Sequence, residues 1–137
     1  MTEIASSAHQ MISGMAPEVQ PGVFVFVTTN DPDLAAFLSD KAISTFREKE
    51  GMSLLIPIDM AEKTNQSLES PMCCITLNVY SSLDGVGLTA AVATALAEHG
   101  IPCNMVAAYH HDHVFVPSDK SDEALAVLRK LQKQQMP

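Results

Sequence analysis

The sequence has no tryptophan, and aromatic residues make up only 5% of its 137 residues. Basic residues are scarce as well, because 8 Lys and Arg stand against 16 Asp and Glu, which gives a formal net charge of −8. A surface this acidic repels phosphate backbones and anionic lipids. Nucleic acid and membrane surfaces are therefore poor candidates as partners.

No apolar run approaches the roughly 20 residues that a membrane-spanning helix needs. The first 15 residues contain no Lys or Arg and no continuous apolar stretch, so they do not have the pattern of a signal peptide. Apolar residues instead recur there at helical spacing: Ile4, Ala8, Met11, Ile12 and Met15. This spacing predicts a short amphipathic helix within residues 1–16.

Cysteine is also rare. The three cysteines are odd in number, and Cys73 and Cys74 are adjacent inside an apolar run. A disulfide framework is therefore not expected, and a reducing cytoplasm is the natural compartment.

What the chain does contain is 47% hydrophobic and 18% charged residues, a composition that supports a packed core in one domain or in two small subdomains.

The first half, residues 17–70, contains a β-branched and aromatic run at 23–29 that predicts a strand. Residues 30–40 have helix-start signals and an apolar face of Leu34, Phe37 and Leu38. Two further strands are expected on either side of a tight turn at Lys49–Gly51, and a short helix from Asp59. The polar segment 64–71 is the best candidate for a boundary between halves.

The second half, residues 71–137, repeats this order. A continuous apolar strand is expected at 72–81, and a helix follows in which Leu88, Val92 and Leu96 recur every four residues before Gly100. Strands at 103–110 and 113–117 precede a C-terminal helix with Leu125, Leu128 and Leu131 on its apolar face. Both halves therefore have the order β-α-β-β-α, the start of a ferredoxin-like sandwich. The predicted class is α+β, with antiparallel sheets and helices packed on one face, and the halves are expected to complete one another's sheets.

One candidate site is the stretch "DGVGLTAA", Asp84 to Ala91, where a strand is followed by a glycine-bearing loop and a helix. Backbone N–H groups at such a helix start attract anions, and Gly85 and Gly87 allow close approach of a ligand. The spacing also fits a dinucleotide fingerprint, but that fold needs more parallel strands than this sequence offers. A small carboxylate or amino-acid ligand is the favoured reading, and glycines that serve only the turn are the alternative.

The second candidate is "AYHHDHVFV", Ala108 to Val116. If the flanking strands pair, His111 and Asp112 form the turn, with His110 and His113 beside it. A two-residue turn splays its side chains outward, so one chain offers about two converging ligands, whereas zinc needs three or four. A polar turn that hydrogen-bonds a neighbouring loop is favoured over a metal site.

The cysteines are the third candidate. Cys73 and Cys74 lie in a predicted core strand, where inert packing is the default, and they point to opposite faces. Cys103 follows Pro102 at a strand start and can border a pocket, but no base stands beside it in the sequence. A thiol nucleophile needs an activated, partly exposed position, so thiol catalysis is disfavoured.

The run "SSLDGVGLTAAVATALA" followed by "YHHDHVFVP" resembles the ACT domain, a small regulatory module that typically binds amino acids. The whole chain is similar to small bacterial proteins made of two ACT-like halves whose function is not established. The resemblance implies a βαββαβ-type fold, assembly through sheets or helices, no cofactor, and a ligand site between a strand-to-helix loop and the start of the following strand. Carried over, the site residues are Ser82, Leu83, Asp84, Gly85, Val86 and Gly87, with Ile101, Cys103 and Asn104 opposite. Many ACT domains have a proline before the loop glycine, where this chain has Val86.

These observations favour a cytoplasmic, non-catalytic module that senses a small molecule, most simply an amino acid, and assembles as a homodimer. Two alternatives stay open. One is a metal- or thiol-dependent enzyme centred on the residues His110, His111, Asp112, His113 and Cys103. The other is a structural subunit that docks on a partner enzyme through a sheet edge.

Overall fold

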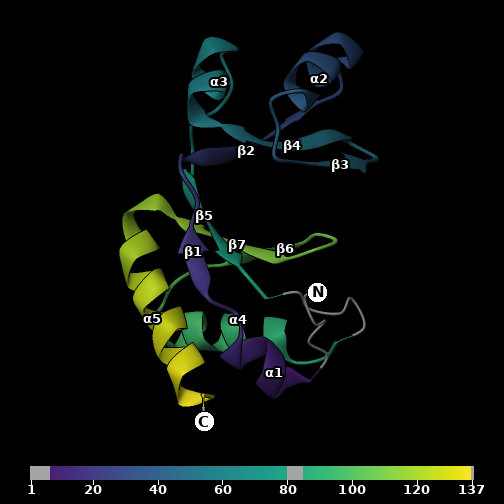
Figure 1. Cartoon of the computed structure of the whole chain (residues 1–137). Helices are drawn as coiled ribbons and strands as arrows, with labels where there is room; N and C mark the ends of the chain where they lie inside the picture. The colour runs from purple at the N-terminus through teal and green to yellow at the C-terminus, as the bar shows by residue number, and fades with distance from the viewer. Residues whose placement is uncertain (1–6, 80–84, 137) are drawn as a thin grey trace. The chain divides into compact units, whose positions relative to one another are not determined.

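The computed structural model describes residues 7–79 and 85–136, and its elements form two units (Figure 1). Unit 1 consists of residues 1–21 together with 73–137, and unit 2 is the segment Gly22–Met72 between them. Each unit is a sheet with helices on one face, so the predicted α+β class with antiparallel pairing is confirmed. Ser82, Leu83 and Asp84 of the expected ligand site lie outside the described residues.

Unit 2 has the predicted order of strand, helix, two strands and helix. Its elements are β2 (Phe24–Thr29), α2 (Pro32–Ser39), β3 (Ser44–Glu48), β4 (Gly51–Pro57) and α3 (Ile58–Lys63). β4 lies in the middle of the sheet and is antiparallel to both β2 and β3. The helices cover one face of this sheet. There, alternate strand residues pack against Leu38 of α2 and Ala61 of α3: Val25, Val27, Leu54 and Ile56. Phe37, expected on the apolar face of α2, is 51% exposed instead.

The sheet of unit 1 has four strands in the order β1-β5-β7-β6. They are β1 (Pro17–Val19), β5 (Met72–Leu77), β6 (Asn104–Ala107) and β7 (Asp112–Pro117). β1 is antiparallel to β5, with Pro17 opposite Leu77 and Val19 opposite Ile75. The fourth strand that the second half lacks is therefore supplied by Pro17–Val19, the start of the expected first half, in line with the expectation that one half completes the other's sheet.

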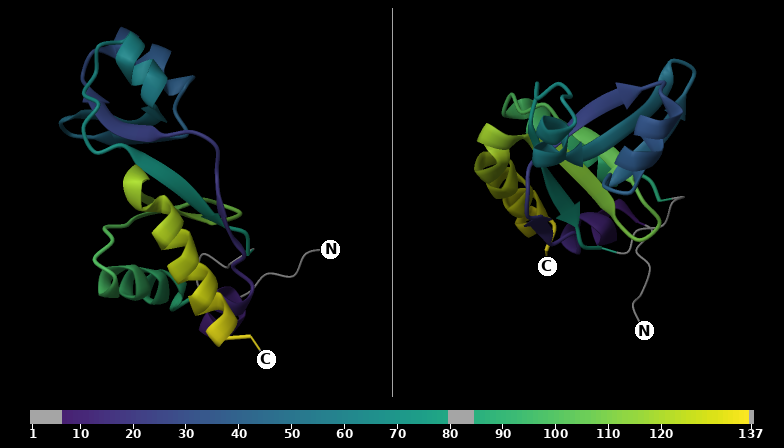
Figure 2. Two further views of the ribbon diagram at one scale, coloured as in Figure 1. Left: turned by 90° about the vertical axis from the view of Figure 1, so that its left-hand side faces the viewer. Right: turned by 90° about the horizontal axis from the view of Figure 1, so that it is seen from above.

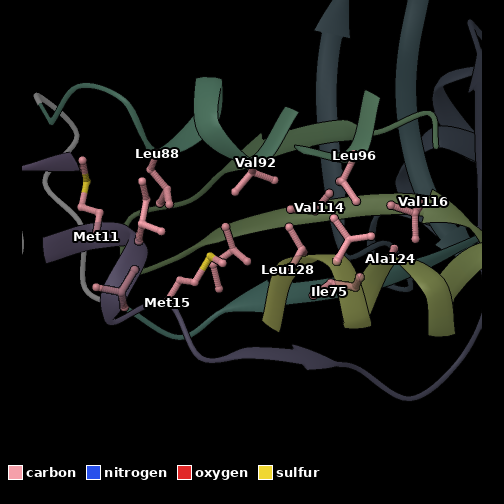
Figure 3. Packing of buried hydrophobic residues seen from close by; sticks show 14 of the residues in the cluster. Met11, Met15, Ile75, Leu88, Val92, Leu96, Val114, Val116, Ala124 and Leu128 are labelled. Atoms are coloured by element: carbon pink, nitrogen blue, oxygen red, sulfur yellow. The ribbon is translucent and has the colours of Figure 1, made fainter. Parts of the chain in front are cut away.

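Three α-helices cover one face of this sheet (Figure 2): α1 (Ala8–Ser13), α4 (Leu88–Glu98) and α5 (Ser121–Gln134), the last after a 3-10 turn at Ser118–Lys120. The core between helices and strands is aliphatic and sulfur-containing (Figure 3). Leu88, Val92 and Leu96 of α4 are buried as predicted, and they face side chains from α1, the segment after it, β5, β7 and α5: Met11, Met15, Ile75, Val114, Val116, Ala124 and Leu128. Leu125 and Leu131 of α5 pack at the edge of this core.

The division of the chain differs from the expected one at its start. Residues 1–16 were expected to form a separate helix and residues 17–70 the first half, whereas α1 and β1 both belong to unit 1. The physical reason is that β1 pairs with β5 and that Met11, Ile12 and Met15 complete the core of unit 1. None of the helices in the described part of the chain is long and apolar enough to cross a membrane.

We expect Gly51→Ala to destabilise unit 2 more than Gly100→Ala destabilises unit 1. Both glycines have positive φ angles, +146° and +68°, so both substitutions introduce backbone strain of about 1 kcal/mol or more. A Cβ at Gly51 would also lie 2.7 Å from the backbone oxygen of Thr29, whereas nothing lies within 4 Å of one at Gly100. The forced shift raises the expected loss at Gly51 to on the order of 3 kcal/mol. Urea unfolding of both variants measures the difference, and equal losses would contradict the contact at Thr29.

Candidate functional site

Helix α4 begins without a side-chain cap from any described residue. Its N-cap is Gly87, with φ of 113°. α3 and α5 also start without a side-chain cap, whereas α1 and α2 are capped by the side chains of Ser7 and Asp31. The first N–H groups of a helix have no partner within the helix, and they carry its partial positive charge. The start of α4 therefore presents the partial positive charge on which the predicted anion site depends.

Gly87 has a second reason to lack a side chain. A Cβ built on it would lie 2.7 Å from the Cβ of Ala8, the first residue of α1. The positive φ and the contact with Ala8 together require glycine at this position. Its neighbour Val86 is 80% exposed, which leaves that side of the chain open to solvent.

The two groups of residues expected to form one ligand site are not brought together within unit 1. Gly87 immediately precedes α4, and Ile101 follows it, so the 11 residues of the helix separate them by about 16 Å. Ile101 is 2% exposed and belongs to the core, and Cys103 packs against that core. Asn104 is exposed, and it points away from the core because its neighbour Met105 packs into it.

The histidine-rich turn lies slightly earlier than predicted. His111 and Asp112 were expected to form the turn, but β7 already begins at Asp112, which pairs with Ala107. The connection is thus the four residues 108–111, closed by a hydrogen bond from the Ala108 N–H to the His111 carbonyl (3.0 Å). The rings of Tyr109 and His110 meet edge to face, with centroids 5.0 Å apart.

His111 connects this turn to the end of β5. Its Nδ1 lies 3.2 Å from the carbonyl oxygen of Val79, and because a carbonyl can only accept, Nδ1 carries the proton and donates. Val79 is the last described residue before the expected ligand loop. This agrees with the interpretation of the histidine stretch as a polar turn that hydrogen-bonds a neighbouring segment.

A second polar group lies on the helix-free face of the same sheet. Thr76, in the middle of β5, is 5% exposed, and its hydroxyl accepts a hydrogen bond from the Gln20 Nε2–H (3.0 Å). The same hydroxyl lies 3.0 Å from His113 Nδ1 and 4.0 Å from Cys74 Sγ. Burial lowers the pKa of His113, the nearby His111 lowers it further, and Asp112 acts in the opposite direction. The neutral imidazole is therefore the form that this site favours.

The geometry gives little support to the metal- or thiol-dependent alternative. In residues 7–79 and 85–136, no three His, Cys, Asp or Glu side chains are placed to hold one metal ion. Burial raises the pKa of the Cys103 thiol and of the Cys74 thiol, so both disfavour the thiolate. Cys103 is also separated from the histidine turn by the whole of β6.

A surface groove of about 470 Å³ runs between α4 and α5, away from the start of α4. It is lined by Ala95, Glu98, His99, Ala126, Val127, Lys130, Leu131 and Gln134. His99 donates from Nδ1 to the Ala95 carbonyl (3.0 Å). Sequence reasoning did not find this groove, because its residues are spread over two helices.

Comparisons with known proteins agree with this architecture. Two family models, each described as an ACT domain, match residues 6–73 and 69–130. A crystal structure of a Vibrio cholerae protein of unknown function, described as a possible transport protein, is 43% identical, with a TM-score of 0.78 over 86% of this chain and 89% of that one. An Agrobacterium tumefaciens protein is 16% identical, with a TM-score of 0.66 over 85% of this chain and 87% of that one. The ligand-free regulatory subunit of aspartate kinase from Thermus thermophilus is 11% identical, with a TM-score of 0.63 over 86% of this chain and 97% of that one. The comparison with curated proteins gave no match.

The lowered pKa of His113 predicts a loss of stability on acidification. The unfolded histidine has a pKa near 6.5, so below that pH the unfolded state binds a proton that the folded state resists. The free energy of unfolding should fall as the pH decreases from about 6.5 toward the folded-state pKa of His113, and this contribution should then level off. His113→Gln should flatten the decrease, whereas His110→Gln, an exposed residue in the turn, should not. Urea unfolding at pH values between about 7.5 and 5 measures how the free energy of unfolding changes with pH. Equal slopes for His113→Gln and the parent would exclude this histidine as the cause.

Proposed function

Since the chain belongs to the ACT domain family, whose members are regulatory, non-catalytic modules that bind small molecules, we propose that it is an amino-acid sensor that acts as a homodimer. The observation that carries the proposal is the start of α4, where Gly87 leaves the first turn without a side-chain cap from the described residues. A ligand carboxylate bound by the backbone N–H groups there gains from the helix dipole. Gly85, Val86 and Gly87 are the described residues that form this side of the site.

Unit 2 provides an internal contrast. Its corresponding helix, α2, starts with Pro32, which has no N–H, and the Asp31 carboxylate accepts from the Asp33 N–H (3.0 Å). The chain's own acidic side chain thus occupies the position that a ligand carboxylate would take. We therefore assign ligand binding to unit 1 alone.

A second copy of the chain can supply Asn104. Within one copy, His111 and Val79 place the turn end of the β6–β7 hairpin beside the end of β5, where the connection to α4 begins. β6 is an edge strand of the unit 1 sheet, and edge strands pair readily with other strands. If two β6 strands pair antiparallel, the Asn104 end of one copy meets the turn end of the other. Asn104 can then read the ammonium or a polar side chain of the ligand.

The two alternatives have less support. An enzyme centred on Cys103 and the histidines lacks a thiolate environment. A subunit that docks on another enzyme needs only a sheet edge and gives the uncapped start of α4 no role. The three free cysteines fit action in a reducing cytoplasm.

Ligand binding predicts a response in thermal unfolding. The purified protein, screened against each of the twenty amino acids at millimolar concentration, should show a higher Tm with one or a few of them, because a ligand that binds only the folded state stabilises it. Divalent metals with a chelator control are screened in parallel. Stabilisation by a metal and by no amino acid would favour the enzyme alternative instead.

The dimer predicts a difference between the two sheet edges. Val106→Lys adds a charge to the β6 edge and should weaken the dimer at least tenfold, a change of about 1.4 kcal/mol. Phe46→Lys makes the matched change on β3, the edge strand of unit 2, where Phe46 is 72% exposed, and should leave the mass unchanged. Light scattering over a range of concentrations measures both, and dissociation by Phe46→Lys alone would place the interface on unit 2.

A further inference from the structure

The connection between β5 and α4 is contacted at both ends by α1. At its C-terminal end, the Cα of Gly87 faces Ala8, as the 2.7 Å distance from a built Cβ shows. At its N-terminal end, a Cβ built on Gly14, the C-cap of α1, would lie 3.4 Å from Val79 Cγ2. The six-residue helix therefore spans from one end of the connection to the other.

The helix is itself firmly held. Ser7 and Gln10 form a capping box at its start, and Met11 and Met15 are 2% and 0% exposed in the core. The Gln132 side chain of α5 donates to the carbonyl of Ser13 (2.8 Å). These contacts fix α1 to the core of unit 1 and to α5.

β5 is bound to the segment after α1 as well. The backbone N–H of Asn78 donates to the carbonyl of Met15, and the Asn78 side chain donates to the carbonyl of Ala16 (3.0 Å). On the far side, His111 donates to Val79 from the hairpin turn. Val79 thus lies between α1 and the hairpin turn. Of the contacts described above, Gly87 makes only the one with Ala8 of α1.

We propose that α1 is the positioning element of the ligand site, with Ala8 fixing the backbone at Gly87 and Gly14 allowing the close approach of Val79. α1 precedes β1 and is no part of the repeated β-α-β-β-α order. The assignment of a ligand to Gly85–Gly87 rests on the proposed function, whereas the positioning by α1 rests on the contacts alone. Preorganised donors bind an anion without the free-energy cost of ordering the backbone.

The test changes α1 without touching the site. Ala8→Leu enlarges the side chain that faces Gly87. His9→Leu introduces the same residue at the next, exposed position, whose side chain contacts Gln135 and not Gly87. Ala8→Gly removes the methyl contact without overpacking and serves if the larger side chain prevents folding. Amide hydrogen exchange of Val79 and Gly85–Leu88 is measured without ligand, and the Tm shift is measured with an equimolar mixture of the twenty amino acids as the probe.

Ala8→Leu, or Ala8→Gly in its place, should accelerate exchange at Gly85–Leu88 several-fold and reduce the Tm shift by more than half. His9→Leu should change neither. Exchange at these amides that stays at the parent rate, or that rises equally in His9→Leu, would overturn the positioning role. A parent protein that does not respond to the mixture would count against the proposed function, and the exchange rates would still decide the role of α1.

Discussion

Pairing of β1 with β5 is the constraint on which the rest of unit 1 depends. The β-α-β-β-α order of residues 72–134 leaves one side of β5 without a neighbour, and Pro17–Val19 occupies that side in antiparallel register. Because β1 must lie there, α1 and the residues just after it are brought against three other elements. These are the start of α4, the end of α5 and the end of β5. The core then includes Met11 and Met15, which a domain made of residues 71–137 alone would lack.

The local structure could be read from the sequence wherever pattern and burial agree. α4 is an example, because Leu88, Val92 and Leu96 repeat at helical spacing and are all buried, and the Gly51 turn is another. The β1 strand could not be read in this way. Its three residues, Pro-Glu-Val, are too few to show the alternation of apolar and polar residues that marks a strand. They form a strand only because they pair with β5, in which Thr76, opposite Glu18, is 58 residues away in sequence. The early start of the histidine turn, at 108 instead of 111, has the same origin, since the register of β6 with β7 decides where the two strands end and begin.

The candidate site was predictable in part. A glycine loop before a helix indicates an anion site by local chemistry, and the structure places Gly87 at the N-cap of α4. Asn104 remains a predicted ligand residue; within one copy, α4 separates it from that loop. Ala8 and the Val79 carbonyl could not be found from the sequence, since an alanine and a backbone oxygen carry no chemical signature. The contact of His111 with Val79 fits the interpretation of this histidine as part of a polar turn.

The insertion of unit 2 into unit 1 has a consequence for synthesis of the chain on the ribosome. Unit 2 is one continuous segment, Gly22–Met72, so all of its strands and helices are available once that segment has emerged. Unit 1 must wait, because β1 is made early but its partner β5 and the helices that cover the sheet are made late. Domains fold as units during synthesis when their segments are complete. The nascent chain therefore carries a completed unit 2 while Met11, Met15 and β1 remain without a core, and their exposure lasts until α5 emerges.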